Sequence, residues 1–83
     1  MYIVCFMSPV IFRADSLKYV IYPKDHQPAH VHVIGPGAEA KFEIRTLKLI
    51  KNYGFSERTL KKITSYLKVR QNSLLEAWHD YQD

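Results

Sequence analysis

The chain has 83 residues, enough for one domain with a single core. Its apolar content of 47% excludes a disordered tail, and its one cysteine, Cys5, excludes both an intramolecular disulfide and a four-cysteine zinc site. No apolar run approaches the roughly 18 residues that a membrane-spanning helix needs. We therefore expect a soluble, cytoplasmic protein that makes no membrane contact.

The formal net charge of +4 is unevenly distributed. Residues 41–70 contain nine lysines and arginines, against only Glu43 and Glu57. This asymmetry predicts an anionic partner, either DNA or RNA or an acidic protein surface, and the alternative is a solvated helix face. The residues expected to bind such a partner are Lys41, Arg45, Lys48, Lys51, Arg58, Lys61 and Lys62.

In chain order, the first predicted strand is Leu17–Tyr22, which is rich in β-branched and aromatic residues and stops at Pro23. A second strand is expected over His30–Ile34, followed by a turn at residues 35–37, because glycine and proline favour turns. Ala40–Ile44 alternates with period two and should pair back, and Leu47 and Leu49 extend the sheet. These segments predict an antiparallel meander of three or four strands.

Beyond Phe55 the apolar residues recur every three or four positions, which predicts an amphipathic helix packed on the sheet. The members of this stripe are Leu60, Ile63, Leu67, Leu74, Trp78 and Tyr81. Ser56 is the expected N-cap, with Glu57 in the first turn. Because residues 73–76 have capping-box form, a break near Asn72 is expected. The fold class is therefore α+β, with one long or two short C-terminal helices, and we favour two helices or one sharply bent helix.

Three histidines within seven residues are the candidate site. His30 and His32 leave the same face of the predicted strand, and His26 lies a proline-containing turn away. His26, His30 and His32 could bind a divalent metal such as zinc, or they could cap the turn through hydrogen bonds. Alternatively, His30 or His32 could act as the general base of a metal-independent ribonuclease, with His79, Lys41 or Arg45 as the second catalytic or anion-binding group.

The C-terminal aromatic cluster has a simpler interpretation. Trp78 is expected in the core rather than stacked on a base, and His79 is expected to complement the helix dipole.

The order of these features resembles one family of small bacterial proteins, domain of unknown function 4160. The resemblance covers about nine tenths of the chain and lies in these segments: Pro9-Val10-Ile11-Phe12-Arg13, the histidine run from Asp25 to Val33, Ala40–Ile44, Asn52–Ser56 and Leu74–Tyr81. Pro28-Ala29 departs from it, since the family has two prolines there. The resemblance implies a compact α+β domain with no established activity, often one half of a toxin–antitoxin-like gene pair.

Family members tend to begin with methionine followed closely by proline, which corresponds here to Met7-Ser8-Pro9. We therefore expect residues 1–8 to be an N-terminal extension, with residues 1–6 upstream of the family's usual start, and residues 9–83 to form a single domain.

Two functions follow as hypotheses. The first is a non-enzymatic interaction subunit of a toxin–antitoxin-like module, which binds a small partner protein encoded nearby, or DNA or RNA, and can form a homodimer. The second is an enzyme, a small histidine-dependent ribonuclease or a metal-dependent hydrolase.

Overall fold

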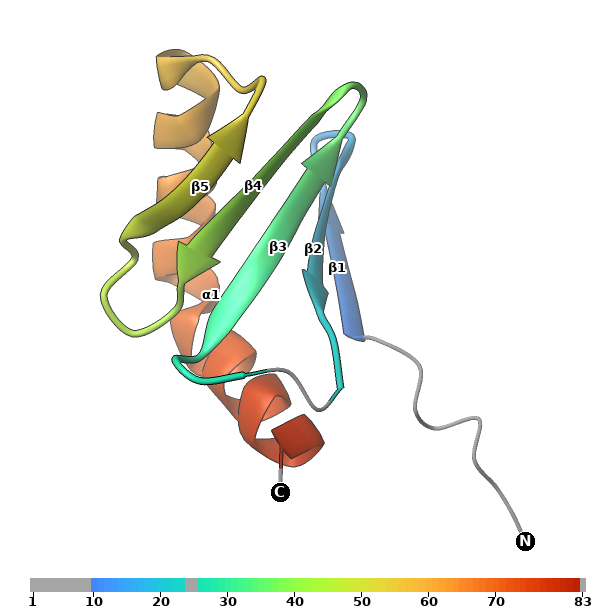
Figure 1. The fold of residues 1–83 in the computed structure, drawn as a ribbon, viewed down its shortest axis with the longest axis vertical. Coiled ribbons are helices and arrows are strands. Elements are labelled where there is room, and N and C mark those ends of the chain that lie inside the picture. Colours follow the sequence, from blue (N-terminus) through green and yellow to red (C-terminus); the bar gives the residue numbers. More distant parts are fainter. Residues whose placement is uncertain (1–9, 24–25, 83) are drawn as a thin grey trace, which may run out of the picture.

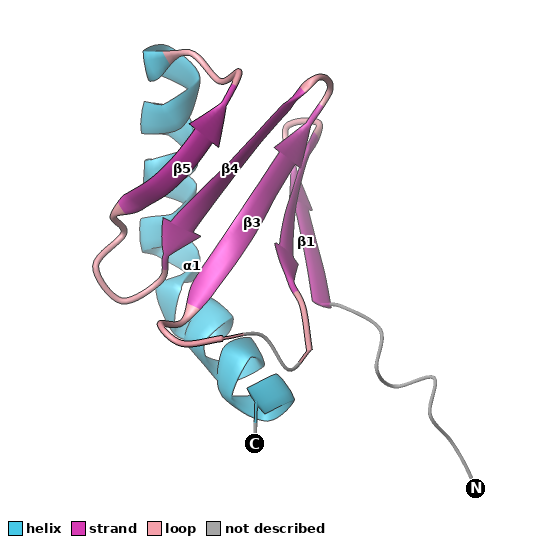
Figure 2. Ribbon diagram, viewed as in Figure 1, coloured by secondary structure: helices cyan, strands magenta, loops and turns pink. Residues whose placement is uncertain are grey.

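The computed structural model describes residues 10–23 and 26–82, and for Val10, Tyr81 and Gln82 it describes only the backbone. Five strands precede one helix: β1 (Val10–Ala14), β2 (Leu17–Ile21), β3 (His30–Gly35), β4 (Ala38–Glu43), β5 (Leu49–Tyr53) and α1 (Glu57–Gln82). The strands form one sheet in the order of the sequence, each antiparallel to the next, and α1 crosses behind the sheet (Figures 1 and 2). The predicted α+β class and the antiparallel meander are confirmed.

The prediction of three or four strands was too low, because it missed strand β1. In the pairing of β1 with β2, Val10 lies opposite Ile21 at one end and Ala14 opposite Leu17 at the other. The two strands are joined by residues 15 and 16 alone. Both of these residues have positive φ, 51° and 65°, as the favoured two-residue hairpin turns require. Since neither is glycine, the usual sequence signal for such a turn is absent, and the strand before it was missed.

The helix covers one face of the sheet, and the core lies between them. Strand alternation turns Val31 and Val33 of β3 and Ala40 and Phe42 of β4 toward α1, where all four are buried. From the helix, a stripe at three- and four-residue spacing is buried against them: Ile63, Leu67, Leu74 and Trp78. Trp78 is fully buried, so its predicted place in the core is confirmed.

The helix is continuous from Glu57 to Gln82, and the predicted break near Asn72 is wrong. The capping-box pattern at residues 73–76 is overridden because the buried stripe continues through Leu74 and Trp78 without a change of face. Next to the expected break, the Gln71 side chain donates hydrogen bonds to the carbonyls of Ile44, at 2.8 Å, and Arg45, at 2.9 Å. These bonds fix the middle of α1 to the loop between β4 and β5.

The start of the helix follows the prediction. Ser56 Oγ accepts a hydrogen bond from Thr59 N at 3.2 Å, as an N-cap does, and Glu57 opens the first turn. Just before it, Asn52 Oδ1 accepts from Phe55 N and Asn52 Nδ2 donates to Phe55 O, which closes the connection around Gly54. Gly54 has a φ of 98°, which explains a glycine there.

Within the described residues no helix is long and apolar enough to cross a membrane. The predicted extension, residues 1–8, lies outside the part of the chain that the structure describes.

Candidate functional site on the open face of the sheet

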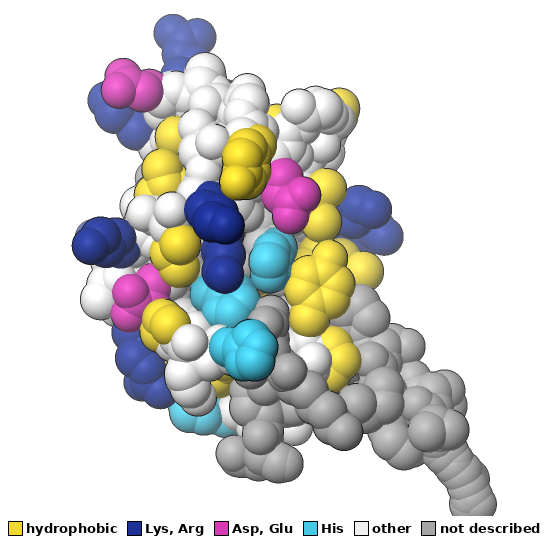
Figure 3. Space-filling view, in the orientation of Figure 1, with side chains coloured by type: hydrophobic (Ala, Val, Ile, Leu, Met, Phe, Trp, Pro, Cys, Tyr) yellow, Lys and Arg dark blue, Asp and Glu magenta, His cyan; other side chains and the backbone are white. Residues whose placement is uncertain are grey.

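The face of the sheet opposite α1 carries the histidines. Since Val31 and Val33 point into the core, His30 and His32 point the other way, together with Glu39, Lys41 and Glu43 of β4. We call this surface the open face, and it faces the viewer in Figure 3, where histidines gather around lysine and arginine side chains. The prediction that His30 and His32 share a face is thereby confirmed.

His30 is the most enclosed of the three histidines, with 3% of its surface exposed. Its Nδ1 lies 2.8 Å from the Pro28 carbonyl oxygen. Because a carbonyl only accepts, Nδ1 carries the proton and donates this hydrogen bond. The turn-binding role left open by the sequence is thus seen for His30.

Trp78 reaches His30 from the helix side, with their ring centroids 5.1 Å apart. This contact is possible because β2 and β3 diverge next to His30 (Figure 1). The two strands pair only between Lys18, opposite Ile34, and Val20, opposite His32. The Trp78 indole Nε1 is buried and has no hydrogen-bond partner among the described residues. His30 therefore links the open face to the core.

His32 is next to His30, with ring centroids 5.2 Å apart, and its Nδ1 lies 3.7 Å from Glu39 Oε2. The Tyr22 ring packs edge-on against it at 5.0 Å. His26 is exposed, on the segment between β2 and β3.

The metal prediction for His26, His30 and His32 rests on spacing alone. Over residues 10–23 and 26–82, no group of three or more His, Cys, Asp or Glu side chains is arranged to hold a metal ion. The metal site at these three histidines therefore stays a prediction.

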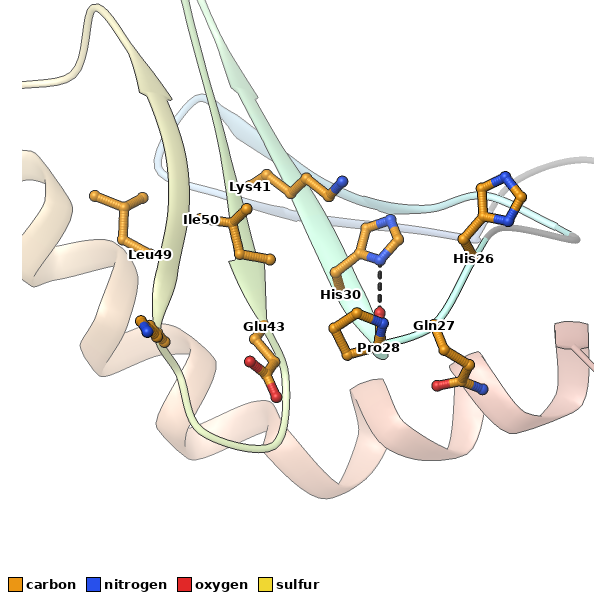
Figure 4. Close-up of a pocket in the computed structure, with 9 residues that line it drawn as sticks. His26, Gln27, Pro28, His30, Lys41, Glu43, Leu49 and Ile50 are labelled. Atoms are coloured by element: carbon orange, nitrogen blue, oxygen red, sulfur yellow. Dashed lines mark hydrogen bonds between the residues drawn. The ribbon is translucent and has the colours of Figure 1, made fainter.

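A pocket of about 460 Å³ opens beside His30 on the open face. Its walls come from the segment before β3, from β3 and β4, from the loop before β5 and from the start of β5. Figure 4 draws the lining residues: His26, Gln27, Pro28, His30, Lys41, Glu43, Lys48, Leu49 and Ile50. Backbone hydrogen bonds join the segments that carry these walls: from Glu43 N to Lys48 O, at 2.8 Å, and from Ile44 N to Ala29 O, at 2.9 Å. The pocket therefore brings two imidazoles and two lysines together on one framework.

A second hollow, of about 210 Å³, lies on the other side of Lys41. His32, Glu39, Lys51 and Tyr53 contribute to its walls, and Lys41 lines both hollows. Lys41 is thus the central charged group of the open face.

The predicted basic surface is divided by the fold. Lys41, Lys48 and Lys51 line the two hollows of the open face, and Arg45 is exposed in the loop between β4 and β5. The remaining predicted residues, Arg58, Lys61 and Lys62, are exposed on α1, on the other side of the sheet. Because a sheet separates the two groups, no single flat contact can use all seven residues.

Several side chains of the open face were not predicted: Tyr22, Glu39, Glu43, Leu49, Ile50 and Tyr53. The alternation of Glu39, Lys41 and Glu43 with buried residues of β4 was a usable signal for two of them. Ile50 could not have been placed, because the pairing of β4 with β5 shifts register between Lys41 and Phe42.

His79 lies in the last turn of α1, as predicted, and is exposed.

Comparison with known proteins gives a family and no activity. The profile of the family described as "Domain of unknown function (DUF4160)" matches residues 17–79, from the start of β2 nearly to the end of α1. No curated protein and no solved structure matches. The match spans four of the five strands, the histidines and Trp78, so the chain belongs to this family of unknown function.

Proposed function

We propose that this protein is a binding protein, the interaction subunit of a bacterial toxin–antitoxin-like pair, and that it docks a small acidic partner protein on the open face. The observation that carries the proposal is the contrast between the two faces of the sheet. One face is covered by α1, whereas the open face is covered by none of the described elements (Figure 2).

Partly exposed apolar and aromatic side chains lie on or beside this face. Tyr22, Leu49 and Ile50 expose 38%, 38% and 40% of their surface, and Tyr53 exposes 64%. Aromatic side chains are enriched at protein interfaces, where they form the buried centre. The adjacent Lys41, Lys48 and Lys51 favour a partner with acidic side chains.

The free edge of β5 adds a second means of contact. β5 is the last strand of the sheet, and all five of its residues are exposed. An unpaired strand edge offers backbone donors and acceptors to a partner strand. A partner can therefore extend the sheet while its side chains lie over the open face.

The test is coexpression with the product of the adjacent small reading frame, followed by calorimetric titration of the purified partners. Ile50→Asp should weaken the complex at least tenfold, because it places an unpaired charge at the centre of the contact and next to the partner's acidic groups. The matched control is Val69→Asp, which changes an 81% exposed side chain on the helix and should leave affinity within twofold.

Two results would contradict the proposal. One is the absence of a complex between the intact chains. The other is equal weakening by Ile50→Asp and Val69→Asp, which would place the contact elsewhere. A homodimer that Ile50→Asp dissociates, with no binding of the neighbouring protein, would assign the face to a second copy of the chain instead.

A second candidate function, a metal-independent ribonuclease, is favoured by the pocket beside His30. His26, His30 and Lys41 line it together. In such an enzyme His30 Nε2 would take the proton of the ribose 2′-OH as that oxygen bonds to phosphorus. His26 would protonate the departing 5′-oxygen as the P–O5′ bond breaks, and Lys41 would stabilise the phosphate oxygens. The products would be a 2′,3′-cyclic phosphate and a 5′-hydroxyl.

Cleavage of a labelled RNA in the presence of EDTA tests this candidate. His26→Ala removes an exposed side chain, so it should abolish cleavage without unfolding the protein, while His79→Ala should not affect it. An inactive wild type, or an activity that EDTA removes, would exclude this mechanism.

A further inference from the structure

Three basic side chains form a row across the open face. His32 of β3 pairs with Lys41 of β4, and Lys41 pairs with Lys51 of β5. Directly paired residues of adjacent antiparallel strands point to the same face with Cβ atoms roughly 5 Å apart. Two lysines in this position repel each other, so the fold places a destabilising pair in the middle of its open face.

The carboxylate nearest to this row lies at one end of it, beside His32, and not at its centre, Lys41. Glu39 Oε2 lies 3.7 Å from His32 Nδ1. Figure 4 shows the Lys41 side chain extending toward His30 while the Glu43 carboxylate points away from it. Among the described residues, no carboxylate lies within 4.0 Å of the Lys41 ammonium, although Lys41 is partly buried. A partly desolvated cation that none of the described carboxylates approaches favours an added anion.

There is room for that anion beside Lys41. Hollows of about 460 Å³ and 210 Å³ lie on its two sides, and imidazoles line both of them, His26 and His30 in the first and His32 in the second. The groups around these hollows are thus ammonium groups and imidazoles from β3, β4, β5 and the segments beside them. This set can surround an oxyanion of several oxygens.

We propose that the row His32–Lys41–Lys51, together with His30, binds a phosphoryl group. A phosphate monoester suits the row better than a carboxylate because its charge approaches two and it offers three terminal oxygens. A phosphodiester carries one charge and two terminal oxygens, which is still enough to bridge two lysines. The ligand is therefore a phosphate monoester or a phosphodiester, supplied by a small phosphorylated molecule or by a nucleic-acid backbone. This site does not depend on whether the open face also docks a protein.

Trp78 provides a direct signal for the test. It is the only tryptophan of the chain, and its ring lies 5.1 Å from that of His30. The full chain is titrated with sodium phosphate at constant ionic strength, and in a second arm with a single-stranded RNA of ten nucleotides. Binding is measured by calorimetry, and Trp78 fluorescence reports whether the ligand lies near His30.

The matched variants are Lys41→Gln and Lys68→Gln, which remove the same charge from the open face and from an exposed position on α1. We expect saturable binding that Lys41→Gln weakens roughly tenfold or more, since a hydrogen bond to a charged group is lost. Lys68→Gln should change affinity less than twofold, and Lys41→Arg, which retains the charge, should bind within a few fold of the wild type.

The two arms identify the source of the phosphate. RNA that binds at least a hundredfold more tightly than phosphate, and that phosphate displaces, assigns the site to a nucleic-acid backbone. Comparable affinities assign it to a small phosphorylated molecule. Absence of saturable binding in both arms, or equal weakening by Lys41→Gln and Lys68→Gln, overturns the proposal but leaves the docking of a partner protein intact.

Discussion

Replacing His30 tests whether this histidine is part of the scaffold as well as of the pocket. His30→Ala removes an imidazole that is 3% exposed and packs against Trp78, and it also removes the hydrogen bond to the Pro28 carbonyl. We expect about 2 kcal/mol from the cavity and about 1 kcal/mol from the lost bond. The latter is limited because Pro28 is exposed and water can hydrate its carbonyl.

The sum of about 3 kcal/mol is large for this chain, since 83 residues give roughly 4–12 kcal/mol of total stability. His30→Phe separates the two contributions, because it keeps a ring against Trp78 and loses the hydrogen bond to the Pro28 carbonyl. It should cost about 1 kcal/mol.

Urea unfolding followed by circular dichroism measures these differences, and the exposed His79→Ala should stay within about 0.5 kcal/mol of the wild type. An Ala variant as stable as the wild type would refute the structural role of His30. A Phe variant as unstable as the Ala variant would show that packing against Trp78 contributes nothing.

Three further predictions concern the frame that holds the open face. Gln71→Ala should cost about 1–2 kcal/mol in urea unfolding, because the Ile44 and Arg45 carbonyls lose their donor, while the exposed neighbour Asn72→Ala should cost less than about 0.5 kcal/mol. Gly54→Ala should destabilise more than Gly37→Ala: both have positive φ, but a Cβ at Gly54 would lie 3.1 Å from the Gly37 carbonyl oxygen, whereas a Cβ at Gly37 meets nothing within 4 Å. Burial, and then the charges of the nearby Tyr66 and Asp15, raise the pKa of Tyr19 from 10.0 to about 12. Between these two pH values the Tyr19 hydroxyl therefore stays protonated in the folded chain but loses its proton in the unfolded chain. The stabilisation is therefore complete below pH 10 and is lost as pH rises to 12, by at most about 3 kcal/mol, and the loss should be absent in Tyr19→Phe.

The sequence predicts the central strands well because their burial is one-sided. Val31 and Val33 alternate with His30 and His32, and only one register buries the valines against Leu67 and its neighbours on α1. Strand β1 was missed because positive φ at Asp15 and Ser16 is imposed by the hairpin they connect, which local composition does not reveal. The helix break was predicted wrongly because a capping pattern is local, whereas the packing that overrides it comes from the sheet.

The site was predicted only in part for a related reason. Spacing along one strand shows that His30 and His32 are neighbours, but the residues that face them come from β4 and β5, and their register depends on turns and on the irregularity after Lys41. Similarly, a count of charges along residues 41–70 cannot show that a sheet separates Lys41 and Lys51 from Lys61 and Lys62. Charge density in the sequence predicts an anionic partner, but the pairing across strands was needed to propose a place for it.

The two proposals for the open face converge on Lys41, and this has a thermodynamic consequence. An acidic side chain of a docked protein and a phosphoryl group would both be drawn to the same lysine, between the same two hollows. If the two ligands exclude each other, each must lower the apparent affinity of the other by the same factor. Phosphate should then release the partner protein from the wild type. It should do so much less effectively from Lys41→Gln, because that variant binds phosphate weakly. A partner that stays bound at saturating phosphate would show that the protein contact and the phosphoryl site occupy separate parts of the open face.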